Sequence, residues 1–346
     1  MGLVTGEPVV VEVLRGETVE SRHLGALAVV DAAGALHTAW GDIDRPVFPR
    51  SAVKLLQALP LVTSGAADAF ALSDAELALA CASHSGEPAH VATAQGWLTR
   101  LDLSAEHLEC GTQWPAREPV LRALVARGEV AGPLHNNCSG KHCGFLCLAC
   151  HLGHQSGAAN RAGFARGYVA PEHPVMREVT HALEVATGQD LARAPRGIDG
   201  CSIPTYALPL RALALAFARV GTGSGLPPDV ASAAARLRRA VAQAPFMVGG
   251  TDRFDTEVMQ ALGERLCCKV GAEGVYCASL PELGLGLALK IDDGASRAAE
   301  AVMAQLALRL LRPSGDAATL LQRLAAPVMR NWRGTEVGRL RMRLEG

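Results

Sequence analysis

The amino-acid sequence predicts an α+β (α/β) fold, in which strands from both ends of the chain form one antiparallel sheet beside a central block of helices. Short β-rich segments bounded by turn residues occur near both ends. The segment between them has apolar residues at the three- and four-residue spacing of helices. Apolar residues make up 49% of the 346 residues and charged residues only 19%, so the chain can bury a large core.

The N-terminal region contains three predicted strands, at residues 8–14, 26–31 and 35–40. The last two are separated by the turn sequence Asp31-Ala-Ala-Gly34. Pro46 and Pro49 then indicate an extended segment. At Ser51 the pattern changes from strand to helix, and this serine is suited to the start of the helix as a cap or first-turn residue.

The central region is predicted to be helical with three loops. Ser73-Asp-Ala-Glu76 matches a capping box and therefore predicts a helix start. The loops cover residues 110–119, 132–140 and 195–204, and residues 83–87 interrupt the helices. Predicted helices follow at residues 88–101, 141–152, 173–187, 206–219 and 229–243.

The C-terminal region returns to strands, at residues 265–270, 274–279 and 284–291, followed by a helix at 296–311 and a last strand at 335–344. No internal repeat or low-complexity linker divides the chain. We therefore expect residues 1–346 to form a single catalytic unit with two lobes. The sheet lobe comprises about 1–50 and 245–346, and the helical lobe about 51–244.

Charge and composition exclude several classes of partner. Lysine and arginine number 33 against 34 acidic residues, giving a net charge of −1, so no basic excess is present to bind nucleic acid. No apolar run is long enough to span a membrane. Glu7 and Glu12 interrupt the apolar start, which is untypical of a signal peptide. With ten cysteines in a large apolar chain, we expect reduced thiols and a cytoplasmic location.

The first candidate for catalysis is Ser51-Ala-Val-Lys54, an S-x-x-K sequence at a predicted helix start. One helical turn brings the two side chains to the same face. A neutral, buried lysine can take the proton of a serine and so make it a nucleophile. The alternative is a capping serine followed by a solvated lysine, and the tetrapeptide alone does not decide between them.

Two further residues strengthen the catalytic interpretation. Penicillin-recognising serine acylases combine S-x-x-K with a serine between helices and a lysine on a sheet strand. This chain has Ser83 after a predicted helix and Lys269 on a predicted strand, in the same order. The alternative is that Ser83 caps a helix and Lys269 is exposed.

The loop Asn136-Asn-Cys-Ser-Gly-Lys-His142 is a candidate metal or anion site. It fails the phosphate-loop pattern, because His135 and His142 stand where glycine and Ser or Thr are required. Cys138 lies at a helix start, which favours thiolate, and Cys201 lies in a similar glycine-containing loop. Two thiolates and a nitrogen donor suit zinc, whereas two buried structural cysteines are the alternative.

The remaining cysteines are predicted to be mostly core residues. Cys143, Cys147 and Cys150 follow one helical stripe. A different zinc site, formed by Cys147 and Cys150 with His151 and His154, remains an alternative.

Five motifs in order resemble the rhizobial-type, or class 3, L-asparaginases, over about residues 8–342. They are Phe48-Pro-Arg-Ser-Ala-Val-Lys54, Cys81-Ala-Ser-His-Ser-Gly-Glu87, His135-Asn-Asn-Cys-Ser-Gly-Lys-His142, Gly197-Ile-Asp-Gly-Cys201 and Lys269-Val-Gly-Ala-Glu-Gly-Val275.

The resemblance implies hydrolysis of L-asparagine to L-aspartate and ammonia. It also implies a fold like that of serine β-lactamases and penicillin-binding proteins, and a homodimer. Two Ser-Lys pairs are implied, Ser51 with Lys54 and Ser83 with Lys269. The implied zinc ligands are Cys138, Lys141 and Cys201, with a water as the fourth ligand.

Two other classes of function remain open. One is a glutaminase or a penicillin-recognising serine hydrolase on the same fold. The other is a zinc-binding protein without catalytic activity, in which zinc and thermal stability would be linked. The paired Ser-Lys motifs argue against the non-catalytic protein, and the near-neutral net charge fits an enzyme whose substrate is a small zwitterion.

Overall fold

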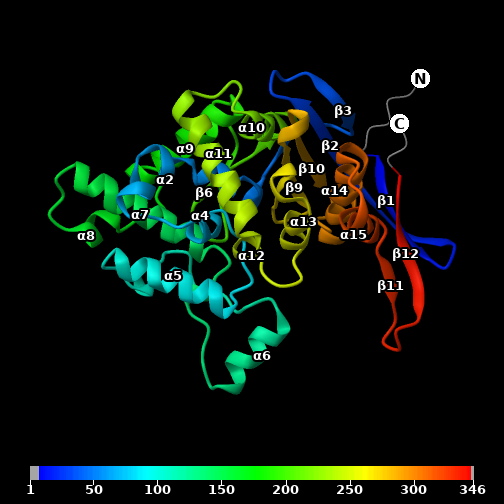
Figure 1. Ribbon diagram of the computed structural model, residues 1–346, viewed down its shortest axis with the longest axis horizontal. Helices are drawn as coiled ribbons and strands as arrows, with labels where there is room; N and C mark the ends of the chain where they lie inside the picture. Colours follow the sequence, from blue (N-terminus) through cyan, green and yellow to red (C-terminus); the bar gives the residue numbers. More distant parts are fainter. Residues whose placement is uncertain (1–7, 344–346) are drawn as a thin grey trace. The chain divides into compact units, whose positions relative to one another are not determined.

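The computed structural model describes residues 8–343, and the chain divides into two compact units (Figure 1). The first unit, here called the sheet unit, comprises residues 1–52, 207–225 and 258–346. The second, the helical unit, comprises residues 53–206 and 226–257. The single catalytic unit with two lobes stays a prediction. Residues 207–225, predicted in the helical lobe, belong to the sheet unit, and residues 245–257, predicted in the sheet lobe, belong to the helical unit.

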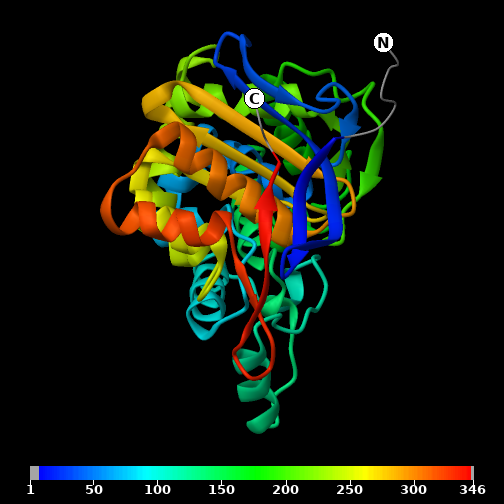
Figure 2. The same ribbon diagram turned by 90° about the vertical axis from the view of Figure 1, so that its right-hand side faces the viewer.

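The sheet unit contains an eight-stranded sheet whose pairs are all antiparallel, in the order β11-β12-β1-β2-β10-β9-β8, with β3 also paired to β2. Strands from the two chain ends lie side by side where β1 meets β12 (Figure 2). The strands are β1 (Val9–Arg15), β2 (Thr18–Asp31), β3 (Leu36–Trp40), β8 (Cys267–Val270), β9 (Val275–Leu280), β10 (Leu285–Ile291), β11 (Val328–Arg330) and β12 (Glu336–Met342). The predicted α+β class and the sheet built from both ends are confirmed.

Helices cover this sheet because its central strands are apolar on both faces. Every residue of β9 is buried, and so are all residues of β10 except Lys290. α10 packs against β2, β9 and β10, and α14 packs against β9, β10 and β12. The helices of the sheet unit are α10 (Leu210–Thr222), α14 (Ser296–Leu311) and α15 (Gly315–Ala325), while α13 (Phe254–Leu262) crosses the division between the units. The short strands β4 (Pro46–Val47) and β7 (Leu208–Pro209) pair with each other.

The helical unit is organised around α7, which is buried along most of its length and contacts α4, α5 and α9. The predicted capping box at Ser73 is present and starts α4. The helices are α1 (Lys54–Gln57), α2 (Leu59–Thr63), α3 (Ala66–Ala69), α4 (Asp74–Ala80), α5 (Pro88–Arg100), α6 (Glu118–Ala126), α7 (Ser139–Gln155), α8 (Arg161–Ala165), α9 (Pro174–Thr187), α11 (Pro228–Gln243) and α12 (Pro245–Val248).

Several elements differ from the sequence prediction. β2 begins at Thr18 rather than at residue 26, because its first residues form an exposed, charged hairpin with β1 that has no apolar pattern. α6 begins within a segment expected to be a loop, and it is mostly exposed. The predicted loop at 195–204 contains a hairpin of β5 (Arg196–Ile198) and β6 (Pro204–Tyr206). Within residues 8–343, no helix has both the length and the apolar character needed to cross a membrane.

Candidate functional site

Lys54 is the centre of the candidate site in the helical unit. It begins α1, directly after the 3-10 turn η1 (Arg50–Val53), and its side chain is only 1% exposed. The flanking residues of α1 are apolar and buried, so the helix carries the lysine inward with them. The apolar sequence around the S-x-x-K motif therefore leads to burial of Lys54, as opposed to the solvated lysine of the alternative interpretation.

The amine of Lys54 contacts three acceptors inside the helical unit. Nζ lies 2.5 Å from the carbonyl oxygen of Ala82, 3.0 Å from Ser83 Oγ and 3.1 Å from Cys138 Sγ. Burial makes each contact costly to lose, because a buried polar group without a partner costs about 1–3 kcal/mol. Lys54 therefore joins a predicted catalytic serine to a predicted metal ligand.

Ser83 lies in a buried loop that follows α4, here called the Ser83 loop (residues 83–87). The backbone N–H of Ser83 donates to Val248 O at 2.9 Å, and that of His84 donates to Asn137 O at 3.2 Å. The loop is thus attached both to the end of α12 and to the segment before α7. These backbone contacts bring the start of the Ser83 loop close to Lys54.

Cys138 and Lys141 come from the start of α7, which packs closely on α4. A Cβ atom at Gly140 would lie 2.4 Å from both the carbonyl oxygen and Cγ of Leu79, so only glycine fits between the two helices. Cys201 comes from the turn of the β5–β6 hairpin. Lys141 Nζ donates to Cys201 Sγ at 3.0 Å, and the Cys201 thiol donates a hydrogen bond to Cys138. Cys138 and Lys141 from the start of α7 therefore meet Cys201 from a distant segment of the chain.

The charges of this cluster favour a thiolate at Cys138. The hydrogen bond from Cys201 lowers the pKa of Cys138 well below its usual range, and the positive charges of Lys54 and Lys141 act in the same direction against burial. Burial opposes the charge of Lys141, but the attraction of Cys201 and Cys138 outweighs it and raises the pKa of the amine. The dipole at the start of α7 adds to the stabilisation of the thiolate.

The donor set fits zinc in chemical type, because two thiols and one amine lie together in a buried cluster. Within residues 8–343, no three or more His, Cys, Asp or Glu side chains form a group that could hold a metal. The predicted zinc site therefore depends on Lys141 as its third protein ligand. The alternative set around Cys147 and Cys150 is not brought together in the described part of the chain.

Ser51 and Lys269 belong to the sheet unit. Ser51 is half-buried in η1, three residues before Lys54, and the division between the units falls inside this turn. Lys269 is buried on β8, where Nζ donates to Val270 O at 2.9 Å. The roles of Ser51 as nucleophile and of Lys269 as partner of Ser83 stay predictions.

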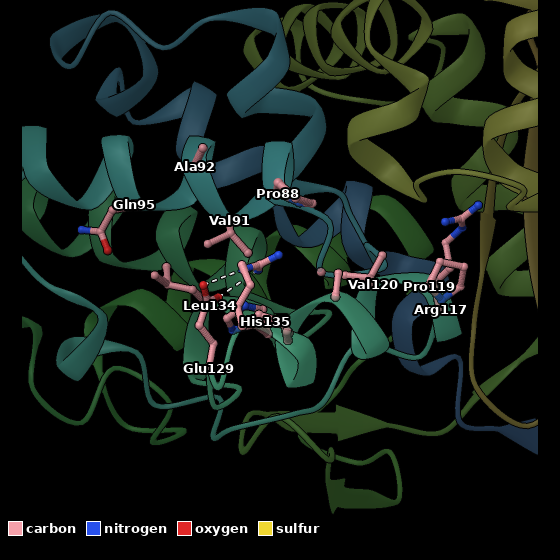
Figure 3. A pocket seen from close by; sticks show the side chains of 14 residues that line it. Pro88, Val91, Ala92, Gln95, Arg117, Pro119, Val120, Glu129, Leu134 and His135 are labelled. Atoms are coloured by element: carbon pink, nitrogen blue, oxygen red, sulfur yellow. Dashed lines mark hydrogen bonds and ion pairs between the residues drawn. The ribbon is translucent and has the colours of Figure 1, made fainter.

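A cavity of about 530 Å³ lies between α5 and α6 in the helical unit (Figure 3). Its walls are mostly apolar, with Val91 on α5 and Val120 on α6, and none of the predicted site residues lines it. The arginines at its edge are already paired: Arg127 with Glu129 at 2.6 Å, and Arg117 with Asp252 at 2.9 Å. The cavity therefore lies outside the predicted chemistry.

The other cysteines serve the core, as predicted. No disulfide joins the ten cysteines, all of which are buried within the described residues. Burial raises the pKa of Cys143 and of Cys150, and it raises the pKa of Cys147 to about 12, so these thiols stay protonated. They differ in this respect from Cys138.

Sequence reasoning missed two features of the site. One is the contact between Lys54 and Cys138, because no spacing relates residues 84 positions apart. The other is His84, which is buried directly after Ser83. An imidazole between the two serines of a short loop was the available signal for His84.

The chain is similar to solved structures at low identity. One is a β-lactamase from Mycobacterium bovis, with 15% identity, 82% of this chain and 94% of that chain covered, and a TM-score of 0.37. Another is a candidate β-lactamase from Bacteroides dorei, with 15% identity, 84% and 93% covered, and a TM-score of 0.41. No curated protein matches the sequence.

The sequence model of L-asparaginase II matches residues 11–342. Since this match covers nearly the whole chain, the protein belongs to the L-asparaginase II family, whose members are asparaginase-type amidohydrolases.

Proposed function

We propose that the protein is an L-asparaginase, which hydrolyses L-asparagine to L-aspartate and ammonia. The observation that carries the proposal is the buried amine of Lys54, 3.0 Å from Ser83 Oγ and 3.1 Å from Cys138 Sγ. Family membership supports an amide substrate. A buried amine beside a hydroxyl is the arrangement that moves protons in serine amidohydrolases.

In the proposed first step, Lys54 has released the proton that makes it positive beside Cys138, and it accepts the proton of Ser51 as Ser51 Oγ attacks the side-chain amide carbon of asparagine. Lys54 passes this proton to Ser83, with which it shares a hydrogen bond, and Ser83 delivers it to the leaving nitrogen. The carbon–nitrogen bond breaks, ammonia leaves, and an acyl-enzyme forms on Ser51. Water then hydrolyses the ester by the reverse proton path and releases aspartate. Lys269 orients or activates Ser83 in this scheme.

Zinc is the proposed cofactor, with Cys138, Cys201 and Lys141 as its protein ligands. When bound, it supplies a Lewis-acidic centre that can hold the amino-acid end of the substrate. Lys141 must give up its proton to become a ligand. The Cys201 thiol must do the same, and Cys138 must remain a thiolate, so we expect zinc affinity to fall as pH decreases.

We further propose a homodimer in the cytoplasm. The homodimer is carried over from the family resemblance alone. The ten buried cysteines without a disulfide support a reducing compartment. Light scattering of the purified protein and fractionation of the source cells test these two proposals.

Ammonia release from L-asparagine by the purified protein tests the main proposal. We expect Ser51→Ala to lower kcat by ~10³-fold or more, as expected for loss of a nucleophile, and Ser83→Ala to lower it strongly as well. Ser224→Ala, an exposed serine, is the matched control and should retain full activity. Near-normal turnover by Ser51→Ala would refute its role as nucleophile.

Competing functions are separated by the choice of substrate. L-Glutamine and a chromogenic β-lactam should be turned over more slowly than L-asparagine, and the reverse order would point to a glutaminase or a penicillin-recognising hydrolase. If no amide is hydrolysed while zinc removal lowers the melting temperature, the protein is a zinc-binding protein without catalysis.

A further inference from the structure

His84 is a buried titratable residue that the mechanism above does not use. Its side chain is 2% exposed and follows Ser83 directly in the chain. Both ring nitrogens have partners inside the helical unit: Nδ1 lies 3.1 Å from the backbone nitrogen of Gly86, and Nε2 lies 2.9 Å from Ser139 Oγ. His84 therefore connects the Ser83 loop to the first residue of α7.

The hydrogen bonds around His84 determine its tautomer in two independent ways. The backbone N–H of Gly86 donates to Nδ1, so the ring hydrogen must be on Nε2. The hydroxyl of Ser139 donates to Leu134 O at 3.0 Å, so its oxygen must accept from His84. Both arguments give a neutral ring that donates from Nε2 to Ser139.

The surroundings also keep this ring neutral and fix its plane. Burial lowers the pKa of His84 well below its usual range, and the nearby charges of His90, Lys54, His135 and Arg253 act in the same direction. The ring stacks on His90 with centroids 4.9 Å apart and 19° between planes. The ring therefore has one orientation and one protonation state.

The other side of the Ser83 loop is held by different contacts. Ser85 Oγ donates to Gly249 O at 2.9 Å, and the carboxylate of Glu87 accepts from the backbone and the hydroxyl of Thr251. Gly250 approaches so closely that a Cβ atom there would lie 2.5 Å from Glu87 Oε1. These contacts fix the end of the loop, whereas His84 supplies the side-chain contact between its start and the helix that carries Cys138.

We propose that His84 is a positioning residue, which holds the Ser83 hydroxyl within hydrogen-bonding distance of Lys54 by donating from Nε2 to Ser139 at the start of α7. This inference rests on the proposed function only for its effect on turnover. The geometric role concerns Ser83, Lys54 and Cys138, which lie in one unit and are connected through Lys54 Nζ.

Two substitutions test the roles of the two ring nitrogens of His84 separately. His84→Asn keeps an acceptor near the position of Nδ1 but loses the donor to Ser139, whereas His84→Gln keeps a donor near the position of Nε2. We expect His84→Asn to lower kcat for asparagine by ~10–100-fold with KM changed less than ~3-fold, the size of effect seen for residues that orient catalytic groups. His84→Gln should retain most of kcat. Ser139→Ala should lower kcat like His84→Asn, and the double variant should be no slower than either single variant.

His173→Asn is the matched control. His173 also accepts a backbone N–H two residues ahead at Nδ1, from Val175, and lies 2.9 Å from Phe164 O through Nε2, but it caps α9 and bonds to α8 rather than to the start of α7. The His173→Asn substitution should leave kcat unchanged. Equal losses of kcat in His84→Asn and His84→Gln that parallel losses of thermal stability would indicate a structural role and overturn the proposal. A wild-type kcat in His84→Asn would also overturn it.

A crystal structure of His84→Asn tests the geometry without reference to any substrate. We expect Ser83 Oγ to move out of hydrogen-bonding distance of Lys54 Nζ, compared with 3.0 Å in the wild type. An unchanged distance overturns the positioning role. If the wild type releases no ammonia from asparagine, the proposed function fails, and the positioning of Ser83 is still decided by this structure.

Discussion

Gly140→Ala is predicted to damage stability and the candidate site together. A Cβ atom at this position would lie 2.4 Å from the carbonyl oxygen and Cγ of Leu79, and 2.9 Å from its Cδ1. Favourable carbon contacts lie at about 3.5–4.0 Å, so α7 must move away from α4 by ~1 Å. The backbone oxygen cannot rotate away as a flexible side chain can, so the helix start that carries Cys138 must shift.

The expected free-energy change combines two opposing effects. Overpacking of this kind costs ~1–3 kcal/mol or more, whereas alanine is favoured over glycine in a helix by about 1 kcal/mol. We therefore expect a net destabilisation of ~0–2 kcal/mol. Because a 1 Å misplacement of catalytic groups can cost ~10²-fold, kcat should fall by about that factor. Bound zinc should decrease as well.

Urea denaturation, metal analysis and ammonia release measure the three effects. Gly96→Ala is the matched control, because Gly96 is exposed in α5 and a Cβ atom there meets nothing within 4 Å. It should stabilise the protein by ~0.5–1 kcal/mol without changing turnover. If Gly140→Ala is as stable and active as Gly96→Ala, the close packing of α4 on α7 does not position the site.

Three further predictions concern the cluster and the fold. Cys138→Ser and Cys201→Ser should each lose zinc, and full occupancy in both variants, measured by metal analysis, would reject the site. A lowered thiol pKa stabilises the folded state above the usual value and loses this effect as pH falls. The raised pKa values of the other buried thiols act in the opposite direction, so the contribution of Cys138 is measured as the stability difference between the metal-free wild type and metal-free Cys138→Ser. This difference should increase between about pH 7 and 8.5, by up to ~1.4 kcal/mol per unit. Lys54→Met should flatten this slope in urea denaturation, because the amine helps to lower the pKa of Cys138. Ser73→Ala should cost ~1 kcal/mol of stability through loss of the α4 cap, with kcat unchanged.

The fold was predictable where the sequence has a strong period or a clear boundary residue. α14 (Ser296–Leu311) matches its predicted limits, and α5 and α9 match within one residue, because an apolar stripe and a proline at the start define them. α6 was missed, since an exposed helix needs no complete apolar face. The first half of β2 was missed for a similar reason: its pairing with β1 is made by backbone hydrogen bonds that any exposed residue can supply.

The site was predictable in its parts but not in its connections. Burial of Lys54 follows from the apolar residues beside it, and the thiolate character of Cys138 follows from its position at a helix start. Their contact depends on how α1, the Ser83 loop and α7 pack, which no local pattern records. The tautomer of His84 depends likewise on hydrogen bonds from two other segments, at Gly86 and Ser139.

The contact of one lysine with both Ser83 and Cys138 changes how cysteine variants should be interpreted. A serine at position 138 removes a metal ligand, but it also removes the negative charge that lies 3.1 Å from Lys54 Nζ. Cys201 contacts Lys141 and donates to Cys138, and a serine at position 201 keeps a donor for that thiolate, so its replacement affects the metal with less effect on Lys54. Loss of activity in Cys138→Ser is therefore not by itself evidence that zinc takes part in turnover. Both variants are expected to lack zinc. If Cys138→Ser loses more activity than Cys201→Ser, the difference measures what the Cys138 thiolate contributes to the serine–lysine chemistry.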